Sequence, residues 1–377
     1  MVALFPPPFS SGERMLNAMI KNILEKKYDV TAINFSADKL SSFAFSFGKI
    51  KNQFTSLWLF GKAVSKVKKL IKKEHFHALY FVTPQSSFGH IRDWFLLNTI
   101  GDKIPYKFAF IQNGQIHYAF QKKWHKRITK SFMDNTSAFV FLTKGLGAKA
   151  TTIPQNKKVF IPNSADASVV LSAKEVENKI AGHRSDNFTL LYLSNMTPSK
   201  GYMDAAQAIK ILHDKNATGI KEANFVGEWL SGEDEKAFRS FVSKNSLENI
   251  IKIHGKISDR KLIKQFHTNA SVFLLPTYFS HEAQPVSIIE ALNAATPVIA
   301  TNHASIPEFI VDGCNGFLVD KQSPEQIAAS IEKLMQPDLW KEMALNARRS
   351  FEEKFSNEKY QEKIFALFET GNEINVG

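Results

Sequence analysis

The sequence predicts an α/β protein that consists of two doubly wound domains. Its 377 residues exceed the size of one ordinary hydrophobic core, and 44% of them are apolar. Short apolar runs alternate with amphipathic segments, and this rhythm occurs in both halves of the chain. Continuously apolar strands that are separated by helices are typical of a parallel sheet covered on both faces.

The expected strands fall into two sets. Those of the first half are residues 2–5, 28–35, 77–83, 107–113, 137–143 and 157–163. Those of the second half are residues 188–194, 222–227, 250–255, 271–277, 296–301 and 316–320. Helical patterns such as GYMDAAQAIKILHDK and SPEQIAASIEKLM separate the strands, and further helical patterns follow the last one.

The joint between the two halves lies in residues 164–187, which are polar and rich in small side chains. We therefore predict a first Rossmann-like domain over residues 1–168 and a second over residues 169–355. Ligands of this fold class bind at the carboxyl ends of the strands, so we expect the site in a cleft between the two domains.

The cysteine content and the apolar runs bear on the compartment. A single cysteine, Cys314, excludes an internal disulfide and favours a reducing environment. The longest apolar runs, such as SVFLLPTYF, are far shorter than the roughly 18 residues that span a bilayer. We therefore expect a soluble, cytoplasmic protein.

The net charge of +12 is distributed unevenly. Residues 1–170 carry 25 Lys+Arg against 9 Asp+Glu, a net charge of +16, whereas the remainder carries −4. Residues 56–76 and 119–132 are basic, amphipathic and contain aromatic side chains, which suits the surface of an anionic membrane. A helix that packs on the core and exposes a solvated lysine face explains the pattern equally well. Nucleic-acid binding is disfavoured, because no binding motif accompanies the charge.

The stretch SHEAQPVSIIEAL places two carboxylates, Glu282 and Glu290, eight positions apart. Pro285 predicts a loop before it and a helix after it, so the two carboxylates lie on different elements and do not form an obvious acid–base pair. No DxD, HxH or HExxH pattern stands nearby, and we expect no metal site. The amides of Val286 and Ser287 at the helix start suit a phosphate group. Taken alone, the two glutamates are also consistent with ordinary solvated charges.

Three further segments follow predicted strands. LYLSNMTPSKGY places Lys200 at a helix entrance, where an ammonium group suits phosphate, although an exposed charge is the ordinary alternative. PPPFSSGERM contains Gly12, which lets a ligand approach the backbone. IQNGQIHYAF contains Asn113 and His117; the histidine alone is equally consistent with a surface residue.

Together these motifs resemble the GT-B glycosyltransferases of family 4, which are retaining enzymes that use nucleotide-activated sugars. EAQPVSIIEAL is similar to the family's E-x7-E motif, and SNMTPSKG is similar to its lysine-bearing loop. TPVIATNHASIPEFIVDGCNGFLVD looks like the strand, turn and helix that follow the motif. SSGER, QNG and VFIPNSAD carry a weaker resemblance in the first half, so the likeness extends over essentially the whole chain.

This resemblance implies a GT-B fold, with the two domains facing each other across a cleft and residues 356–377 returning to the first domain. It implies a metal-independent, retaining hexosyltransferase that needs no cofactor. The donor is a nucleotide-diphosphate sugar of the UDP or GDP type, and the acceptor is a glycan or a lipid-linked glycan. Enzymes of bacterial surface polysaccharides and lipopolysaccharide look similar, which suggests a protein on the inner face of the cytoplasmic membrane.

The resemblance also assigns roles to individual residues. Lys200 and the amides of Val286 and Ser287 hold the diphosphate, Glu282 lies near the donor sugar, and Glu290 binds the ribose. The candidate catalytic residues are Lys200, Glu282, Asn113 and His117. The candidate donor-binding residues are Gly12, Arg14, Asn195, Gly227, Gly255, Lys256, Ile257, Pro285, Val286, Ser287 and Glu290.

The chain departs from the family's pattern at three places. Asn195 stands where the family carries an arginine, and Arg14 is the candidate replacement for that cation. Ser10 and Ser11 stand where a glycine pair is expected, and Asn113 stands where the first domain often carries a histidine. A non-catalytic relative is therefore one alternative. A nucleotide-sugar epimerase, which has a similar two-domain fold, is another.

Overall fold

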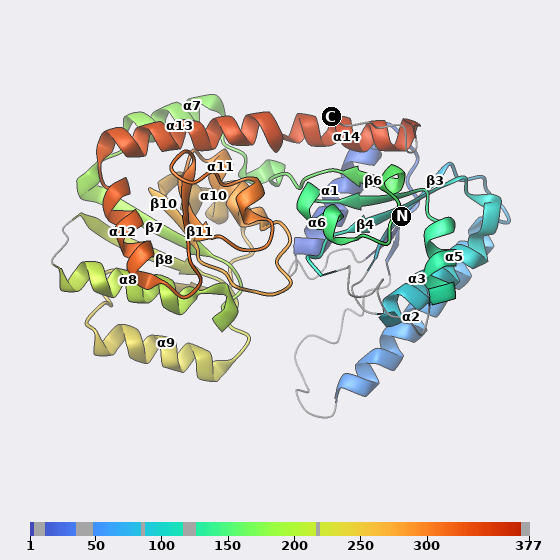
Figure 1. Cartoon of the computed structure of the whole chain (residues 1–377), viewed down its shortest axis with the longest axis horizontal. Helices are drawn as coiled ribbons and strands as arrows, with labels where there is room; N and C mark the ends of the chain where they lie inside the picture. The colour runs from blue at the N-terminus through green and yellow to red at the C-terminus, as the bar shows by residue number, and fades with distance from the viewer. Residues whose placement is uncertain (4–11, 35–47, 84–86, 116–125, 216–218, 371–377) are drawn as a thin grey trace. The chain divides into compact units, whose positions relative to one another are not determined.

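The structure is a computed structural model that describes residues 1–3, 12–34, 48–83, 87–115, 126–215 and 219–370 (Figure 1). It divides into two compact units, one formed by Met1–Pro162 with Tyr360–Gly377 and the other by Asn163–Lys359. The first boundary between the units lies a few residues before the predicted boundary at 168/169. The chain returns to the first unit at a second boundary, a few residues after the predicted one at 355/356.

The first unit contains a six-stranded parallel sheet in the order β2-β1-β3-β4-β5-β6. Its strands are β1 (Val2–Ala3), β2 (Ile33–Asn34), β3 (Ala78–Val82), β4 (Tyr106–Ile111), β5 (Ala138–Phe141) and β6 (Lys158–Phe160). Every expected run of the first half contains a strand, but β2 is much shorter than the predicted 28–35. The chain before β2 is held differently, because the Tyr28 amide donates to the Leu24 carbonyl at the end of the preceding helix.

Helices cover both faces of this first sheet. They are α1 (Gly12–Leu24), α2 (Gly48–Leu70), α3 (Ser87–Ile100), α5 (Lys126–Asp134), α6 (Lys144–Lys149) and α14 (Asn357–Thr370). Successive strand residues point to opposite faces. On β3, Tyr80 belongs to the core that α1 and α14 complete, whereas its neighbour Phe81 packs edge-on against Phe132 of α5. This two-sided burial explains why the strands are apolar throughout.

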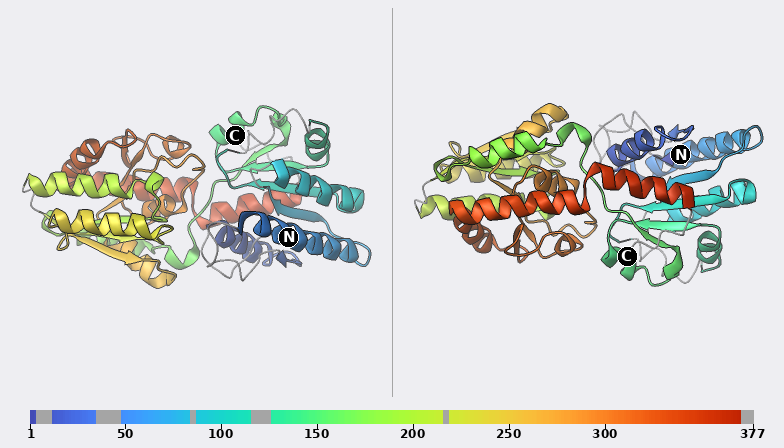
Figure 2. Two further views of the ribbon diagram at one scale, coloured as in Figure 1. Left: turned by 90° about the horizontal axis from the view of Figure 1, so that it is seen from below. Right: turned by 90° about the horizontal axis from the view of Figure 1, so that it is seen from above.

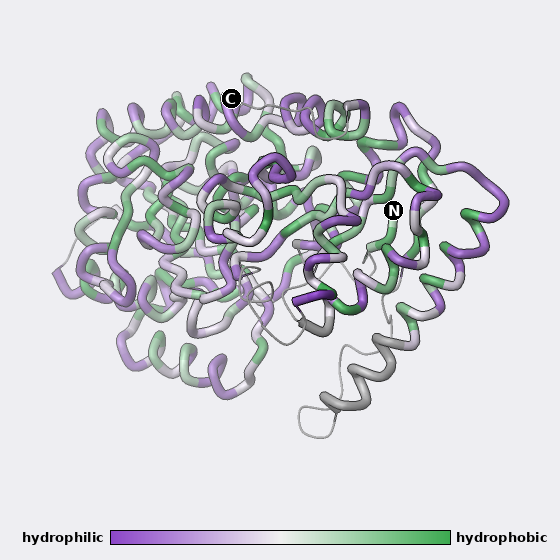
Figure 3. Tube along the Cα trace, turned by 45° about the vertical axis from the view of Figure 1, so that its right-hand side comes forward, coloured by the Kyte–Doolittle hydropathy of each residue, from purple (hydrophilic) through white to green (hydrophobic). Residues whose placement is uncertain are grey.

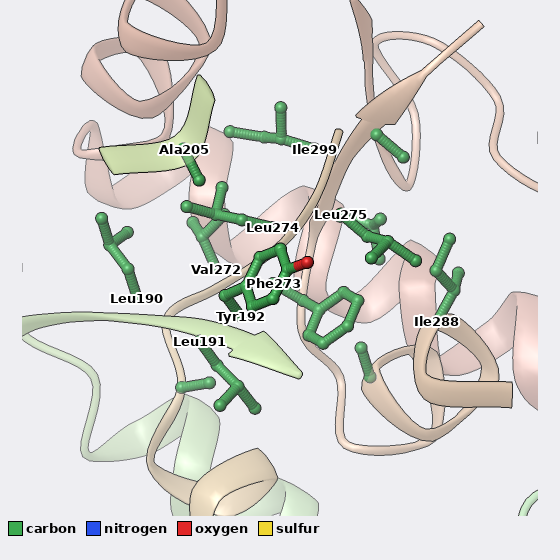
Figure 4. Close-up of a cluster of buried hydrophobic side chains, with 14 of the residues drawn as sticks. Leu190, Leu191, Tyr192, Ala205, Val272, Phe273, Leu274, Leu275, Ile288 and Ile299 are labelled. Atoms are coloured by element: carbon green, nitrogen blue, oxygen red, sulfur yellow. The ribbon is translucent and has the colours of Figure 1, made fainter. Parts of the chain in front are cut away.

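The second unit contains another six-stranded parallel sheet, in the order β12-β11-β10-β7-β8-β9. Its strands are β7 (Phe188–Leu193), β8 (Ile220–Val226), β9 (Ile251–Gly255), β10 (Val272–Leu275), β11 (Val298–Thr301) and β12 (Gly316–Val319). All six match the predicted runs. The order in which strands are added reverses between β7 and β10, because β8 and β9 extend the sheet on one side and β11 and β12 extend it on the other. Ligands of doubly wound folds bind at this position. Buried side chains of these two strands, including Tyr192 and Phe273, form the centre of the core (Figure 4).

The helices of the second unit begin at residues that favour helix starts. They are α7 (Ala173–Ala181), α8 (Tyr202–Asp214), α9 (Gly232–Lys244), α10 (Arg260–Asn269), α11 (Val286–Asn293), α12 (Pro324–Leu334) and α13 (Pro337–Lys354). Ser172 forms a capping box with Glu175 at α7, and Ser231 and Asp259 cap α9 and α10. Each unit is thus a doubly wound domain, as predicted. No helix in the described ranges is both long enough and apolar enough to span a membrane.

Candidate functional site

Two loops meet at the switch point of the second sheet. One follows β7 and leads to α8, and the other follows β10 and leads to α11. The Tyr278 amide donates to the Ser199 carbonyl at 2.8 Å, and the Thr277 hydroxyl oxygen lies 3.3 Å from the same carbonyl. These contacts join the loop that carries Lys200 to the loop that carries Glu282.

Gly201 allows the two loops to approach this closely. Its φ of +78° lies in the left-handed region, and a Cβ atom here would stand 2.2 Å from the carbonyl oxygen of Pro276. Both the conformation and the space therefore require glycine. Because Gly201 also precedes the first residue of α8, the same glycine fixes the backbone of Lys200 at the helix entrance.

Lys200 and Glu282 form an ion pair in this junction. The Nζ atom of Lys200 lies 2.6 Å from Oε2 of Glu282, and the two side chains are only 16% and 8% exposed. The Thr277 hydroxyl donates to the same carboxylate oxygen at 3.1 Å, and the ammonium lies 4.8 Å from the centre of the Phe279 ring. The sequence predicted both residues for the site but assigned them to different parts of a ligand. The structure brings them into direct contact.

The Glu282 loop is anchored on both sides. His303 contacts the Phe279 carbonyl through Nε2 at 3.0 Å, and Thr301 donates a short hydrogen bond to the Thr277 carbonyl. On the other side, the side-chain oxygen of Gln284 accepts from the Asn163 amide at 2.6 Å. These contacts anchor the chain on either side of Glu282.

Helix α11 begins where the sequence predicted it to begin. Pro285 is its N-cap residue, Val286 and Ser287 form its first turn and are partly exposed, and no side chain caps its N-terminus. The partial positive charge of the helix dipole therefore remains available to an anion.

Glu290 lies one turn into α11 and is buried, with 3% exposure. One carboxylate oxygen accepts from Arg260 at 2.5 Å, and the other lies 3.5 Å from Nε2 of the fully buried His267. Burial raises the pKa of this carboxyl, but His267 and Arg260 together lower it by more, so the pKa of Glu290 is below its usual value. Glu290 therefore remains ionised in the folded protein at neutral pH.

Neither of these two partners of Glu290 was among the residues predicted from the sequence. Arg260 and His267 are seven residues apart on α10, which places both on the same helix face. The spacing of seven residues indicates that Arg260 and His267 share a helix face. Nothing in the sequence, however, indicated that α10 faces α11. The Arg260 side chain is 27% exposed and its Nε atom lies 4.0 Å from Asp166, so the network reaches the surface through the arginine.

The carboxyl ends of β8 and β9 contribute the remaining predicted residues of the second unit. The Gly227 amide donates to the Gly255 carbonyl at 2.8 Å, and a Cβ atom on Gly227 would stand 1.8 Å from the Ser194 carbonyl oxygen. Lys256 forms an ion pair with Glu228 at 2.8 Å, and both of its neighbours, Gly255 and Ile257, are partly exposed.

Asn195, which replaces the expected arginine, has an exposed side chain in the loop after β7. Its backbone carbonyl accepts from the Thr197 amide at 2.9 Å. The side chain thus stands on the same loop as Lys200 but supplies no positive charge there.

Of the predicted residues of the first unit, those that the structure describes lie at the start of α1 and after β4. Gly12 begins α1, and Arg14 follows it in the first turn. Asn113 follows β4 and accepts from the Gln115 amide at 3.4 Å. Burial raises the pKa of Glu13, while the charges of Arg92 and Arg14 lower it by less. His117 lies outside the described residues, as do Ser10 and Ser11.

The described residues contain no cluster of three or more His, Cys, Asp or Glu side chains that could hold a metal ion. In the second unit, the features that suit an anion are the Lys200 ammonium and the uncapped start of α11, and both lie beside the carboxyl ends of the strands. Both lie at the switch point, where ligands of doubly wound folds bind.

Comparison with known proteins finds similar sequences for the second unit. Residues 173–354 match the family of group 1 glycosyl transferases. The capsular polysaccharide biosynthesis glycosyltransferase CapM of Staphylococcus aureus is 28% identical over 201 residues, which cover 53% of this chain and 50% of CapM. The chain spans half or less of the length of the first curated relatives that it matches. The match to group 1 transferases includes both loops and α11.

Solved structures match nearly the whole chain. Sucrose-phosphate synthase from Thermosynechococcus elongatus superimposes with a TM-score of 0.74 at 15% identity, covering 97% of this chain and 98% of that one. HepE from Anabaena, in complex with UDP and glucose, gives a TM-score of 0.68 at 15% identity and covers 98% of this chain and 99% of its own. These likenesses show that the chain has the GT-B fold, which confirms the predicted fold class.

Proposed function

We propose that the chain is a family 4 glycosyltransferase of the retaining, metal-independent hexosyltransferase type. It transfers a sugar from a nucleotide-diphosphate donor of the UDP or GDP type to a hydroxyl of a glycan or lipid-linked acceptor in polysaccharide biosynthesis. The observation that carries the proposal is the buried Lys200–Glu282 pair at the switch point of a unit that matches group 1 transferases. The single cysteine favours a reducing compartment, so the proposed location is the cytoplasm.

The proposed roles follow from charge and position. Lys200 and the start of α11 stabilise the diphosphate, since both supply positive charge in a poorly hydrated junction. Glu282 accepts hydrogen bonds from sugar hydroxyls through Oε1, the carboxylate oxygen that Lys200 and Thr277 do not contact. Glu290 is held ionised by Arg260 and His267, and it accepts from the ribose hydroxyls.

The chemical step is a substitution at the anomeric carbon of the sugar. The bond from this carbon to the diphosphate oxygen breaks, and a bond to the acceptor oxygen forms on the same face. The proton of the acceptor hydroxyl passes to the departing phosphate oxygen, which balances the charges. Negative charge grows on the leaving group during this step, and a preorganised Lys200 ammonium stabilises the transition state more than the ground state.

The first test replaces this cation. Lys200→Ala removes a donor comparable to one oxyanion-hole group, and we expect turnover to fall by about a hundredfold or more. The matched control is Lys210→Ala, because Lys210 forms an exposed pair with Asp214 on the neighbouring helix α8. The assay measures the release of nucleoside diphosphate together with the formation of labelled product. Near-normal transfer by the Lys200 variant would show that this lysine does not hold the leaving group.

The donor is identified by a thermal-shift screen of UDP, GDP, ADP and their sugars. A ligand that binds only the folded state raises the melting temperature, and at a fixed ligand concentration the rise increases with the logarithm of its affinity. We expect a UDP or GDP compound to raise it in the wild type and by less in the Lys200→Ala variant. A shift that is equal in both proteins would place the nucleotide away from Lys200.

A further inference from the structure

Helices α2, α3 and α5 lie in one row on the first sheet, with α3 in the middle (Figures 1 and 2). The Arg92 guanidinium of α3 lies 4.7 Å from the Phe60 ring of α2, and the Trp94 indole donates to Ser131 of α5 at 3.1 Å. The three helices therefore present a continuous outer surface, which we call the basic aromatic face.

Two exposed aromatic side chains stand on this face. Trp58 of α2 is 58% exposed and Phe95 of α3 is 54% exposed. The other large apolar side chains that are exposed in the described ranges are aliphatic and lie in the second unit: Leu230, Leu262, Val311 and Leu345. The two exposed aromatic rings of the described ranges thus both belong to this one layer of helices, and with cations around them they suit an interaction surface.

The charges on the same face are almost all positive. Lys62, Lys66 and Lys69 follow Trp58 along one side of α2, and the Lys62 ammonium lies 3.5 Å from the centre of the Trp58 ring. Polar and apolar residues alternate along the described part of α2 with helical spacing (Figure 3). Helix α5 adds Lys126, Arg127 and Lys130, all of them in its first two turns.

Acidic residues do not offset these cations. The sequence of α2 contains no Asp or Glu. Asp93 of α3 is buried and paired with Arg92 at 2.7 Å, and Asp134 at the end of α5 is the other carboxylate of the three helices. The face therefore complements a surface that is both negatively charged and able to accept aromatic rings.

We propose that the basic aromatic face docks the protein on a bilayer that contains anionic phospholipids. Trp58 and Phe95 enter the boundary between headgroups and acyl chains, and the surrounding lysines neutralise the phosphates. The rings stand on the outer faces of helices, as in interfacial amphipathic helices, whereas proteins that bind single-stranded nucleic acids stack bases within a basic groove. The inference goes beyond sugar transfer and does not depend on it.

Flotation of the full-length protein with vesicles tests the proposal. Vesicles of phosphatidylcholine alone are compared with vesicles that contain equal amounts of phosphatidylcholine and phosphatidylglycerol. We expect binding to the anionic vesicles alone, and we expect it to weaken as salt is raised. Trp58→Ser with Phe95→Ser, and separately Lys62→Glu with Lys66→Glu, should each weaken binding by about tenfold or more.

Matched controls come from the second unit. Leu230→Ser with Leu345→Ser removes apolar side chains of comparable exposure, and Lys236→Glu with Lys244→Glu makes the same charge change on α9. Both control proteins should bind like the wild type, and all variants should retain the wild-type melting temperature. Absence of flotation, equal binding by the test and control variants, or tighter binding to transfer RNA than to anionic vesicles would overturn the proposal.

Discussion

At the scale of single residues, the charged groups of this chain owe their properties to partners distant in sequence. Lys200 and Glu282 are 82 positions apart, and Arg260 meets Glu290 across 30 positions. The sequence identified Lys200, Glu282 and Glu290 because their local patterns resemble a known motif. It could not identify the ion pairs, because a pair depends on where two loops meet and not on either loop alone.

Asp93 of the first unit allows a test of how burial of a carboxyl group affects stability. Burial raises the pKa of its carboxyl to about 6, and Arg92 and Thr83 oppose this shift. Because the pKa is higher in the folded than in the unfolded state, the stabilisation that Asp93 supplies is complete below about pH 4 and is lost as the pH rises through 6. Its side chain is 2% exposed, so solvent does not screen the effect.

We therefore expect Asp93→Asn to gain stability relative to the wild type as the pH rises from 4 to 7, by up to about 3 kcal/mol. The measurement is urea-induced unfolding of the full chain at several pH values, in which the transition of the first unit is followed. Exposed Asp102, in the same unit, provides the control, and Asp102→Asn should show no such trend. A difference between Asp93→Asn and the wild type that does not change with pH would contradict the assignment.

At the scale of elements, the sequence predicted the strands well and their ends less well. All the expected runs of the second half became strands, since apolar residues that are buried on both faces leave a clear pattern. The run 28–35 was overestimated, because only Ile33 and Asn34 pair with β1. Pro285 correctly predicted the start of α11, which shows that local stereochemistry is more readable than pairing.

The approach of the two site loops makes a prediction at this scale. Gly201→Ala places a methyl group 2.2 Å from the Pro276 carbonyl oxygen in a left-handed conformation. The loops must separate, and a displacement of Lys200 by about 1 Å is expected to lower turnover by about a hundredfold. Gly61→Ala is the control, since the space around Gly61 is open and alanine is more favourable than glycine in a helix interior by up to about 1 kcal/mol. Equal activity of both variants would show that close approach of the loops is not required.

At the scale of the whole molecule, the first unit is discontinuous in sequence. Ile364 and Leu367 of α14 are fully buried with strand residues such as Tyr80 and Phe108, although some 200 residues of the second unit intervene. The amphipathic pattern of this last helix was visible in the sequence. Its return to the first unit was expected only from the resemblance, because an apolar stripe does not specify which sheet it covers.

This discontinuity predicts which unit each core substitution destabilises. Ile364→Ala and Ile331→Ala both remove a fully buried isoleucine, one from α14 and the other from α12 of the second unit. Each should lower the free energy of unfolding of its own unit by about 2 to 5 kcal/mol. Calorimetry of the full chain measures the two transitions.

A bound nucleotide distinguishes the two transitions, because a ligand stabilises the unit that binds it. The candidate site lies on the second unit, so the nucleotide found in the thermal-shift screen should raise the transition that Ile331→Ala lowers. The transition that Ile364→Ala lowers should respond less. If the nucleotide raised only the transition of the first unit, the site around Lys200 would be wrongly placed, even if the chain proved to be a transferase.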